Sequence, residues 1–436
     1  MENSAQGLAH APKSADMIRV LQTDDSLRNV SAEDFLFDGE DAPLALAFIS
    51  PHVDFAAVTA TISKIAESTK LVAVSTAGEL CATSPDATPY CRADGSWNNV
   101  VIQIFPPDLF EAICIRTIPL PDEDIRAGNP QLEHEERLKR LVTALNQAAP
   151  PFRIDARDTI ALTFIDGLSA SENSFMEAVY RSARFPCLFV GGSAGGKFDF
   201  KNTYVFDSQK VVEDHAVIVL LKLAPGRGYG VLKSQNFTKT DKSFVVIEAD
   251  PDRRIVKSVI DPQTGSVEPF LDVLARTLKT DPSGVQAQLA RNTFGLELKG
   301  ELYVRSISGV NIAEGSVSFY CDVNPGDQLV MLQATDFLTQ TSKDLTSYLN
   351  SNPTPLGAVL NDCILRRLHN ADELAEMKNL WPMPVAGFST FGELFGININ
   401  ETLSALIFFD TSDADVRDPY IEHFPIYYAR FVNHFT

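Results

Sequence analysis

The chain has 436 residues, 45% of them hydrophobic, and its 57 acidic and 37 basic residues give a formal net charge of −20. This charge repels phosphate backbones and anionic lipids, so neither nucleic acid nor a membrane surface is an expected partner. No apolar run approaches the roughly 18 residues of a membrane-spanning helix, and residues 1–15 lack the pattern of a secretory signal. The composition therefore predicts a globular, cytoplasmic protein.

The first half of the chain alternates strand-like and helix-like segments. Short apolar runs predict strands at 43–50, 71–75, 99–105, 109–116, 159–165, 187–190, 203–206 and 215–223. Helical spacing predicts helices at 55–68, 131–149 and 171–183. The strand–helix–strand order at 43–75 favours a parallel pair. Residues 225–230 hold one proline and three glycines, so we expect no strand there.

The second half repeats this alternation. We expect strands at 244–249, 254–260, 301–307, 317–323, 328–333, 356–360, 384–389 and 403–409, and helices at 269–278, 336–349 and 371–380. The predicted fold class is α/β, with two related α/β domains whose mixed, partly parallel sheets are flanked by helices. The expected domains are a polar tail (1–30), a first domain (31–235) and a second domain with an aromatic C-terminal tail (236–436).

A six-residue motif, S-T-x-G-E-L, occurs once in each half, at 75–80 and at 389–394, directly after an apolar strand. Loops at the carboxyl ends of strands are where α/β sheets bind ligands. We therefore predict ligand contacts from the following residues: Ser75, Thr76, Gly78, Glu79, Ser389, Thr390, Gly392 and Glu393. The alternative is a structural turn that was duplicated together with its domain, because turn chemistry alone also selects Gly, Ser and Thr. Both interpretations imply a duplicated fold, and the sequence leaves open whether the two domains share one cleft.

Four further segments lie next to predicted strands, and two of them, 166–172 and 361–367, occupy equivalent places in the two halves. They add these candidate ligand-binding residues: Asp166, Ser169, Ser193, Asn361, Cys363, Arg366 and Asn400. Positive charge from Arg366 and Arg367 would favour a thiolate at Cys363. The alternative is that these arginines form a solvated helix end or bind glutamates. The Gly-rich segment 191–197 lacks the Ser or Thr of a P-loop because Phe198 stands there.

The sequence gives no support for catalysis. The six cysteines and seven histidines show no zinc-type spacing, and no G-x-S-x-G nucleophile motif precedes a helix. An enzyme using Asp166 or Cys363 would lack a base and an acid partner. We therefore expect a binding protein without catalytic residues.

Several motifs in order along the chain resemble the FIST-domain proteins, a family of intracellular signal-transduction sensors found in bacteria. The N-terminal part is similar at S-T-A-G-E-L (75–80), D-G-L-S-A-S-E (166–172) and G-G-S-A-G-G (191–196). The C-terminal part is similar at D-V-L-A-R-T-L (272–278), A-G-F-S-T-F-G-E-L (386–394) and N-E-T-L (400–403). This resemblance implies a sensory protein that binds a small ligand and signals to a partner.

Three other segments, at 302–307, 318–323 and 361–367, look similar to the NosP branch of the family. That resemblance implies haem b as cofactor, nitric oxide as the signal, and regulation of a separate histidine kinase or cyclic-di-GMP signalling protein. His215 and His369 are then the candidate iron ligands, with Cys363 third. The alternative function is a receptor for a small polar metabolite such as an amino acid, bound between the two S-T-x-G-E loops.

Overall fold

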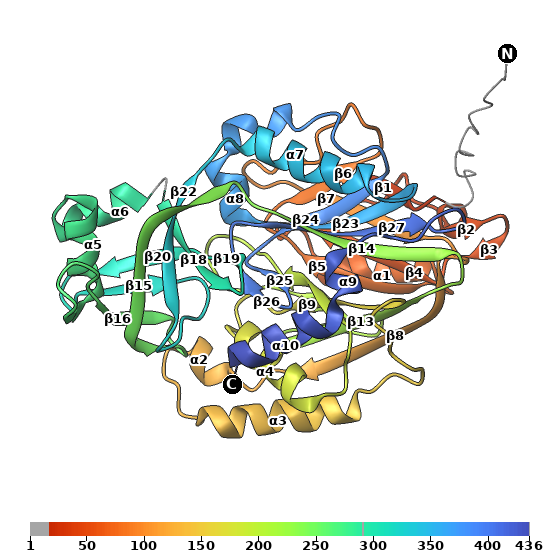
Figure 1. Cartoon of the computed structure of the whole chain (residues 1–436). Coiled ribbons are helices and arrows are strands. Elements are labelled where there is room, and N and C mark those ends of the chain that lie inside the picture. The colour runs from red at the N-terminus through yellow and green to blue at the C-terminus, as the bar shows by residue number, and fades with distance from the viewer. Residues whose placement is uncertain (1–16, 290–291, 436) are drawn as a thin grey trace, which may run out of the picture.

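The computed structural model describes residues 17–289 and 292–435. Figure 1 shows a large body made of three sheets and, at the left, a smaller unit built on a fourth sheet. The mixed sheets with parallel pairs and flanking helices confirm the predicted α/β class. No helix in the described part of the chain is long and apolar enough to cross a membrane.

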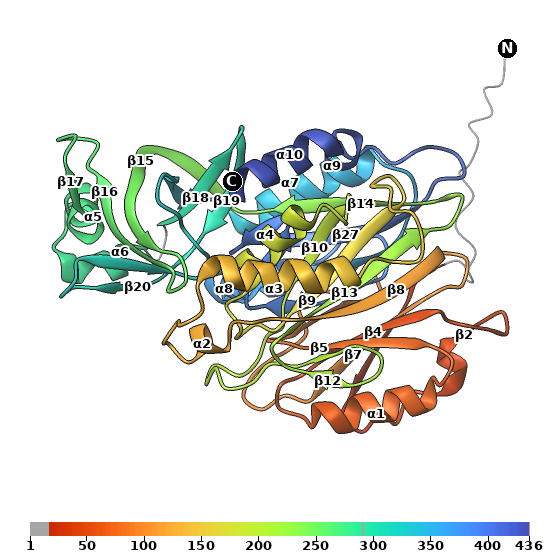
Figure 2. The ribbon, with the colours of Figure 1, turned by 90° about the horizontal axis from the view of Figure 1, so that it is seen from below.

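The first sheet is built around the parallel pair predicted at 43–75. Its strands, in spatial order, are β1 (Arg19–Asp24), β7 (Asn99–Phe105), β4 (Leu44–Ile49), β5 (Lys70–Ser75), β11 (Val205–Phe206) and β12 (Val211–Val212). Helix α1 (Phe55–Ile65) connects β4 to β5 and packs its apolar residues on the outer face of this sheet (Figure 2). Asp54 caps α1 by accepting a hydrogen bond from the Ala57 amide, which explains why the helix begins there.

The second sheet has the order β26 (Ile397–Ile399), β25 (Glu393–Phe395), β10 (Leu188–Ser193), β9 (Thr159–Ile165), β13 (His215–Leu223) and β8 (Phe110–Pro119). Helix α4 (Glu172–Ser182) connects the parallel strands β9 and β10, and α3 (His134–Gln147) packs beside it. Short helix α2 (Glu123–Arg126) precedes α3. At the chain end, α9 (Pro419–Glu422) leads into α10 (Phe424–Phe435), whose aromatic residues contact α4.

The third sheet has the order β14 (Arg227–Ser234), β27 (Leu403–Asp410), β23 (Pro355–Cys363), β24 (Val385–Thr390) and β6 (Glu79–Ala82). Helix α8 (Ile364–His369) and the 3₁₀ helix η5 (Ala371–Glu376) connect the parallel pair β23 and β24. Helix α7 (Phe337–Asn350) precedes β23 and contributes to the apolar cluster on this sheet. A small pair, β2 (Leu36–Phe37) with β3 (Glu40–Asp41), follows the 3₁₀ helix η2 (Ala32–Phe35).

The fourth sheet forms the separate unit. Its strands run β19 (Glu301–Arg305), β18 (Asn292–Leu298), β22 (Gln328–Ala334), β15 (Phe237–Asp250), β16 (Ile255–Ile260), β21 (Ser316–Phe319) and β20 (Ile307–Asn311), with β17 (Val267–Pro269) paired to β16. Helices α5 (Phe270–Leu278) and α6 (Val285–Gln288), with the 3₁₀ turn η3 (Pro282–Gly284), cover one face and enclose a core of their own. We call residues 237–334 the fourth-sheet unit.

The first three sheets exchange strands in a cycle. In each one, a parallel pair joined through a helical segment is followed by a turn, and the strand after that turn pairs with the next sheet. After β5, strand β6 joins β24 of the third sheet; after β24, strand β25 joins β10 of the second; after β10, strand β11 joins β5 of the first. Each sheet is thus completed by a strand from another.

The turns that make these exchanges also bind one another through their backbones. The Ala77 amide donates to the Ser389 carbonyl at 2.9 Å, the Phe391 amide to Ser193 at 3.1 Å, and the Gly195 amide to Ser75 at 2.9 Å. Each donor lies two residues after its own turn's serine, so the three turns are related by a pseudo-threefold arrangement. The sequence motif identified two of these turns, and the structure adds a third at 193–196. We call the three turns the hub.

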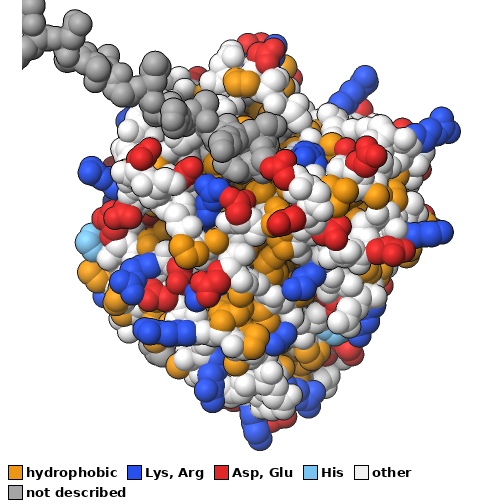
Figure 3. Space-filling view, turned by 90° about the vertical axis from the view of Figure 1, so that its right-hand side faces the viewer, with side chains coloured by type: hydrophobic (Ala, Val, Ile, Leu, Met, Phe, Trp, Pro, Cys, Tyr) orange, Lys and Arg blue, Asp and Glu red, His pale blue; other side chains and the backbone are white. Residues whose placement is uncertain are grey.

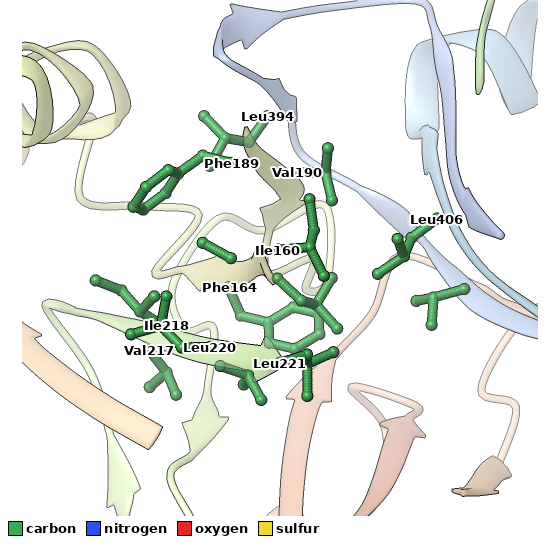
Figure 4. Packing of buried hydrophobic residues seen from close by; sticks show 14 of the residues in the cluster. Ile160, Phe164, Phe189, Val190, Val217, Ile218, Leu220, Leu221, Leu394 and Leu406 are labelled. Atoms are coloured by element: carbon green, nitrogen blue, oxygen red, sulfur yellow. The ribbon is translucent and has the colours of Figure 1, made fainter. Parts of the chain in front are cut away.

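The main core lies between the three sheets. Phe388 of β24 stacks on Phe48 of β4 with ring centroids 5.6 Å apart and lies 5.9 Å from Phe164 of β9. Figure 4 shows Phe164 packed with Ile160 and Leu221 of the second sheet. The face turned away from the fourth-sheet unit carries acidic and basic side chains side by side (Figure 3).

The structure differs from the sequence-based expectations in three segments, at 225–230, 371–380 and 1–30. Residues 227–234 form strand β14 although no strand was expected at 225–230. The glycine at 230 lets the Tyr348 hydroxyl approach the strand closely, since a Cβ at Gly230 would lie 2.0 Å from that hydroxyl. The helix expected at 371–380 is a 3₁₀ helix that ends at Glu376. Within the expected polar tail, residues 1–16 lie outside the described residues, and Arg19–Asp24 form strand β1 against β7.

Candidate functional site

A cavity of about 250 Å³ lies at the carboxyl ends of β9, β23 and β24, where the body meets the fourth-sheet unit. The loop after β9 contributes Gly167 and Leu168, and helix α8 contributes Ile364, Leu365 and Leu368. The other lining residues come from five more segments: Glu172, Phe198, Phe200, Arg254, Tyr320 and Phe391. Its place at strand ends is the position at which α/β folds bind ligands.

The charged residues of the lining form one ion network. Arg254, from the turn between β15 and β16, donates to Glu172 at 2.6 Å and to Asp322 at 3.3 Å. The hydroxyl of Ser193, in the hub, donates to the other oxygen of Glu172 at 2.6 Å. Burial raises the pKa of Asp322 to about 6 even though Arg254 lies beside it. This network connects the hub, helix α4 and the fourth-sheet unit.

Aromatic rings surround the cavity on its open side. The Phe200 ring lies 5.5 Å from Phe391 and 6.5 Å from Phe198. Phe198 and Phe200 are 55% and 58% exposed, and Leu368 is 50% exposed, although all three are apolar. Large exposed apolar side chains gathered at one cavity are typical of a binding site. The cavity thus combines mostly apolar walls with one ion pair, between Arg254 and Glu172.

The eight residues predicted from the S-T-x-G-E motif are brought together in the hub, but they are buried. Thr76 donates to Glu79 at 2.5 Å, and the Trp97 indole donates to the same carboxylate at 2.9 Å. In the second copy, Thr390 donates to Glu393, which also accepts from the Thr402 amide at 3.2 Å. Burial raises the pKa of both glutamates.

The remaining motif residues hold the turns in place. Ser75 donates to the Gly195 carbonyl at 2.7 Å, and the Arg367 guanidinium donates to the Ser389 hydroxyl at 3.2 Å. A Cβ at Gly78 (φ +139°) would meet that guanidinium, and one at Gly392 would lie 3.2 Å from Asn398. Their role in ligand binding stays a prediction, and the contacts in the structure are internal.

Asp166 and Ser169 shape the loop beneath the cavity. One Asp166 oxygen accepts from the Leu168 amide at 3.0 Å and from Thr203, and Ser169 donates to the Asp166 carbonyl at 2.7 Å. Leu168 itself lines the cavity. The loop after β9 therefore lines the cavity with Gly167 and Leu168, and the Asp166 carboxylate does not line it.

The expectation of a thiolate at Cys363 is wrong. Cys363 is fully buried, and desolvation together with Glu393 and Glu401 raises its pKa. Arg366 is also buried and pairs with Asp362 at 2.7 Å, so its charge is used within the core. Arg367 donates to the Cys91 carbonyl. Neither arginine is a solvated helix end.

Asn361 and Asn400 lie in the interior as well. The Asn361 amide lies 3.4 Å from the Ser404 hydroxyl. The Asn400 side-chain oxygen accepts from Cys321 at 2.9 Å and from the Ser306 amide at 3.3 Å, which ties the third sheet to the fourth-sheet unit. Both therefore connect elements of the fold.

None of the ligand-binding residues predicted from the sequence is among the described residues that line the 250 Å³ cavity. The predicted loops at 166–172, 361–367 and 389–394 contribute lining residues, but these are neighbours of the predicted ones and mostly apolar. Leu168 follows Asp166-Gly167, and Ile364 and Leu365 follow Cys363 directly. A signal existed in the exposed pair Phe198 and Phe200, which stand among polar residues after a Gly-rich turn.

The two candidate haem ligands lie apart. The His215 ring Nδ1 lies 2.6 Å from the carbonyl of Glu213, in the turn between β12 and β13. The His369 Nδ1 lies 3.0 Å from Glu401, which raises the pKa of the imidazole, and His369 lines a cavity of about 520 Å³. A carboxylate behind a histidine is common at metal sites.

The lining of that larger cavity does not match the needs of haem. Haem requires apolar faces and basic groups for its propionates. The cavity beside His369 has a few apolar residues, Phe237, Leu289 and Ala334, but no Lys or Arg among its described lining residues, and it carries the acidic residues Asp336, Glu373 and Glu401. The residues present there therefore do not fit the cofactor.

Comparison with protein-family models decides the family. A FIST N domain matches residues 43–259, and a FIST C domain matches residues 271–396. The chain belongs to the FIST family. FIST domains are signal-transduction sensory domains, which agrees with the resemblance seen in the sequence motifs. The junction between the two FIST matches falls inside the fourth-sheet unit, between β16 and α5. No curated protein matches the chain.

Proposed function

We propose that this FIST protein is a sensor for a small metabolite with an apolar body and a polar head group, bound in the 250 Å³ cavity. An apolar amino acid has this chemistry. The observation that carries the proposal is the single ion pair, Arg254 with Glu172, in an otherwise apolar lining. The carboxylate of an amino acid would bind Arg254, and its ammonium would bind Glu172.

The site also suggests how binding would be reported. Arg254 and Tyr320 belong to the fourth-sheet unit, whereas Glu172, Leu368 and Phe391 belong to the body. A ligand in the cavity therefore contacts both parts of the molecule, and its affinity depends on how they are arranged. A separate signalling protein would detect that arrangement. A histidine kinase or a cyclic-di-GMP signalling protein remains our proposed partner class.

A thermal-shift screen of amino acids and related carboxylates tests the proposal. Hits should be lost in Leu368→Trp, which fills the entrance from a half-exposed position, and reduced in Glu172→Gln. Ile312→Trp is the matched control, because Ile312 is 60% exposed, lies in the turn between β20 and β21, and does not line the cavity. Hits that persist unchanged in Leu368→Trp would place the ligand elsewhere.

A haem-based nitric oxide sensor is the second proposal, supported by the carboxylate behind His369 and opposed by the acidic lining around it. The absorption spectrum after haem loading tests it. A stoichiometric band that changes with nitric oxide and is lost in His369→Ala would support haem binding at this residue. Haem that is removed by desalting would reject it.

A further inference from the structure

A third cavity, of about 470 Å³, lies on the other side of the ion network, between helices α3 and α4, the end of α10 and the fourth-sheet unit. We propose that it is a binding site for a small organic ammonium ion. The inference does not depend on the function proposed for the 250 Å³ cavity, since it rests on different lining residues.

Asp322 offers this cavity a carboxylate with an acceptor oxygen that is unpaired within the described part of the chain. Asp322 lines this cavity and is 93% buried, since its exposed fraction is 7%. One of its oxygens accepts from Arg254 at 3.3 Å, and the other, Oδ2, has no hydrogen-bond partner among the described residues. A buried carboxylate oxygen without a donor is costly, so the site favours a ligand that supplies one.

The lining of this cavity contains more acidic than basic side chains. Glu177, Asp252 and Asp322 contribute three carboxylates, whereas Arg181 is the single guanidinium in this lining. Arg181 and His134 both bind Glu177, at 2.6 and 3.0 Å, which leaves Asp322 without a second cation. Desolvation lowers the pKa of His434 to about 4, so its ring is neutral near pH 7. The cavity therefore attracts a cation.

The lining of this cavity suits an organic cation better than a metal ion. No group of three or more His, Cys, Asp or Glu in residues 17–289 and 292–435 has the arrangement of a metal site. The walls include the Phe435 ring, Ile125 and Pro325, which suit a short hydrocarbon chain, and Asn173 and Asn324 add neutral polar groups. A primary ammonium ion with a short apolar tail matches both the acceptor and the walls.

Calorimetric titration of the full chain with n-butylammonium chloride tests the proposal, with n-butanol as a neutral probe of the same shape. We expect binding of the ammonium ion only, weakened about tenfold or more in Asp322→Asn, because one charge-assisted hydrogen bond is lost. Asn173→Phe, which fills the cavity from a half-buried position, should also abolish binding. Asp86→Asn, an equal charge change on the surface, should leave it unchanged.

Three results would overturn the proposal: no heat with the ammonium ion, equal binding of n-butanol, or unchanged affinity in Asp322→Asn. If Asp322→Asn does not fold, Asn173→Phe decides, because it leaves the ion network intact. Unchanged affinity in that variant would equally reject the site.

Discussion

The three turns of the hub share one backbone arrangement, but their side chains differ. Two of them, at 75–79 and 389–393, place a glutamate against their own threonine in the buried core. The third has Ala194 and Lys197 at the equivalent positions, and its Ser193 instead binds Glu172 of the cavity. The comparison teaches that the most recognisable motif copies stabilise the fold, whereas the divergent copy lies closest to the candidate site.

The largest expected effect comes from breaking the shared backbone of the hub. In Gly195→Ala, the new Cβ would lie 2.2 Å from the Ala77 amide nitrogen and 2.9 Å from the Ser389 carbonyl. These are backbone atoms that cannot move aside singly, so we expect a loss of about 3 kcal/mol or more in the free energy of unfolding. Urea denaturation measures it. Gly309→Ala, where the space is open, should change stability by less than about 1 kcal/mol.

A smaller effect is expected from the glutamates of the two S-T-x-G-E turns. Glu393→Gln replaces one of the two acceptor oxygens by an NH₂ group; the remaining oxygen can still accept from the Thr402 amide, but the Thr390 hydroxyl must then turn from donor to acceptor in a closely packed core. We expect a loss of about 1–3 kcal/mol in the free energy of unfolding, and a similar loss for Glu79→Gln. Unchanged stability in both variants, with weaker ligand-induced shifts, would instead assign the glutamates to ligand binding.

The pH dependence of stability probes the contact between the third sheet and the fourth-sheet unit. Glu401, which also binds Ser306, raises the pKa of His369, so the protonated ring stabilises the folded state. This contribution is complete below the unfolded pKa of about 6.5 and is lost as the pH rises through the folded value. Because the ring is half exposed, we expect less than about 1 kcal/mol. His369→Gln should flatten this part of the profile; an unchanged slope would remove the pair as its cause.

The smallest effect on stability is expected after the divergent turn. Phe198 is 55% exposed, so Phe198→Ser should change the free energy of unfolding by no more than about 0.5 kcal/mol. The same variant should reduce the thermal shift given by any ligand of the 250 Å³ cavity, because it removes a ring at the entrance. A stable variant with an undiminished shift would separate this loop from the site.

Much of the fold could be predicted because its main strands are long and apolar. The parallel pair β4 and β5 and the helix between them follow directly from hydrophobic periodicity. The strand exchange could not be predicted, since β6, β11 and β25 have only two to four residues. Segments of that length carry no periodic signal, and tertiary packing chooses their partners.

For the candidate site, the sequence predicts the loops that surround the cavity but not the side chains that line it. Polar residues after strands attract attention, and they identified the loops that surround the cavity. The side chains that line it, such as Leu168 and Phe391, are apolar and look like ordinary core residues in the sequence. The ion pair of Arg254 with Glu172 joins residues 82 positions apart, which no local pattern reveals.

The cyclic strand exchange has a consequence for attempts to divide the molecule. A cut near residue 235 would leave the first fragment without β25 and the second without β6, although each would retain the sheet edge that the missing strand normally covers. Two such fragments should be poorly soluble alone and should restore one another when coexpressed. The two fragments could therefore serve as the halves of a split reporter. Their reassembly would require the pairs β25 with β10 and β6 with β24 to form together.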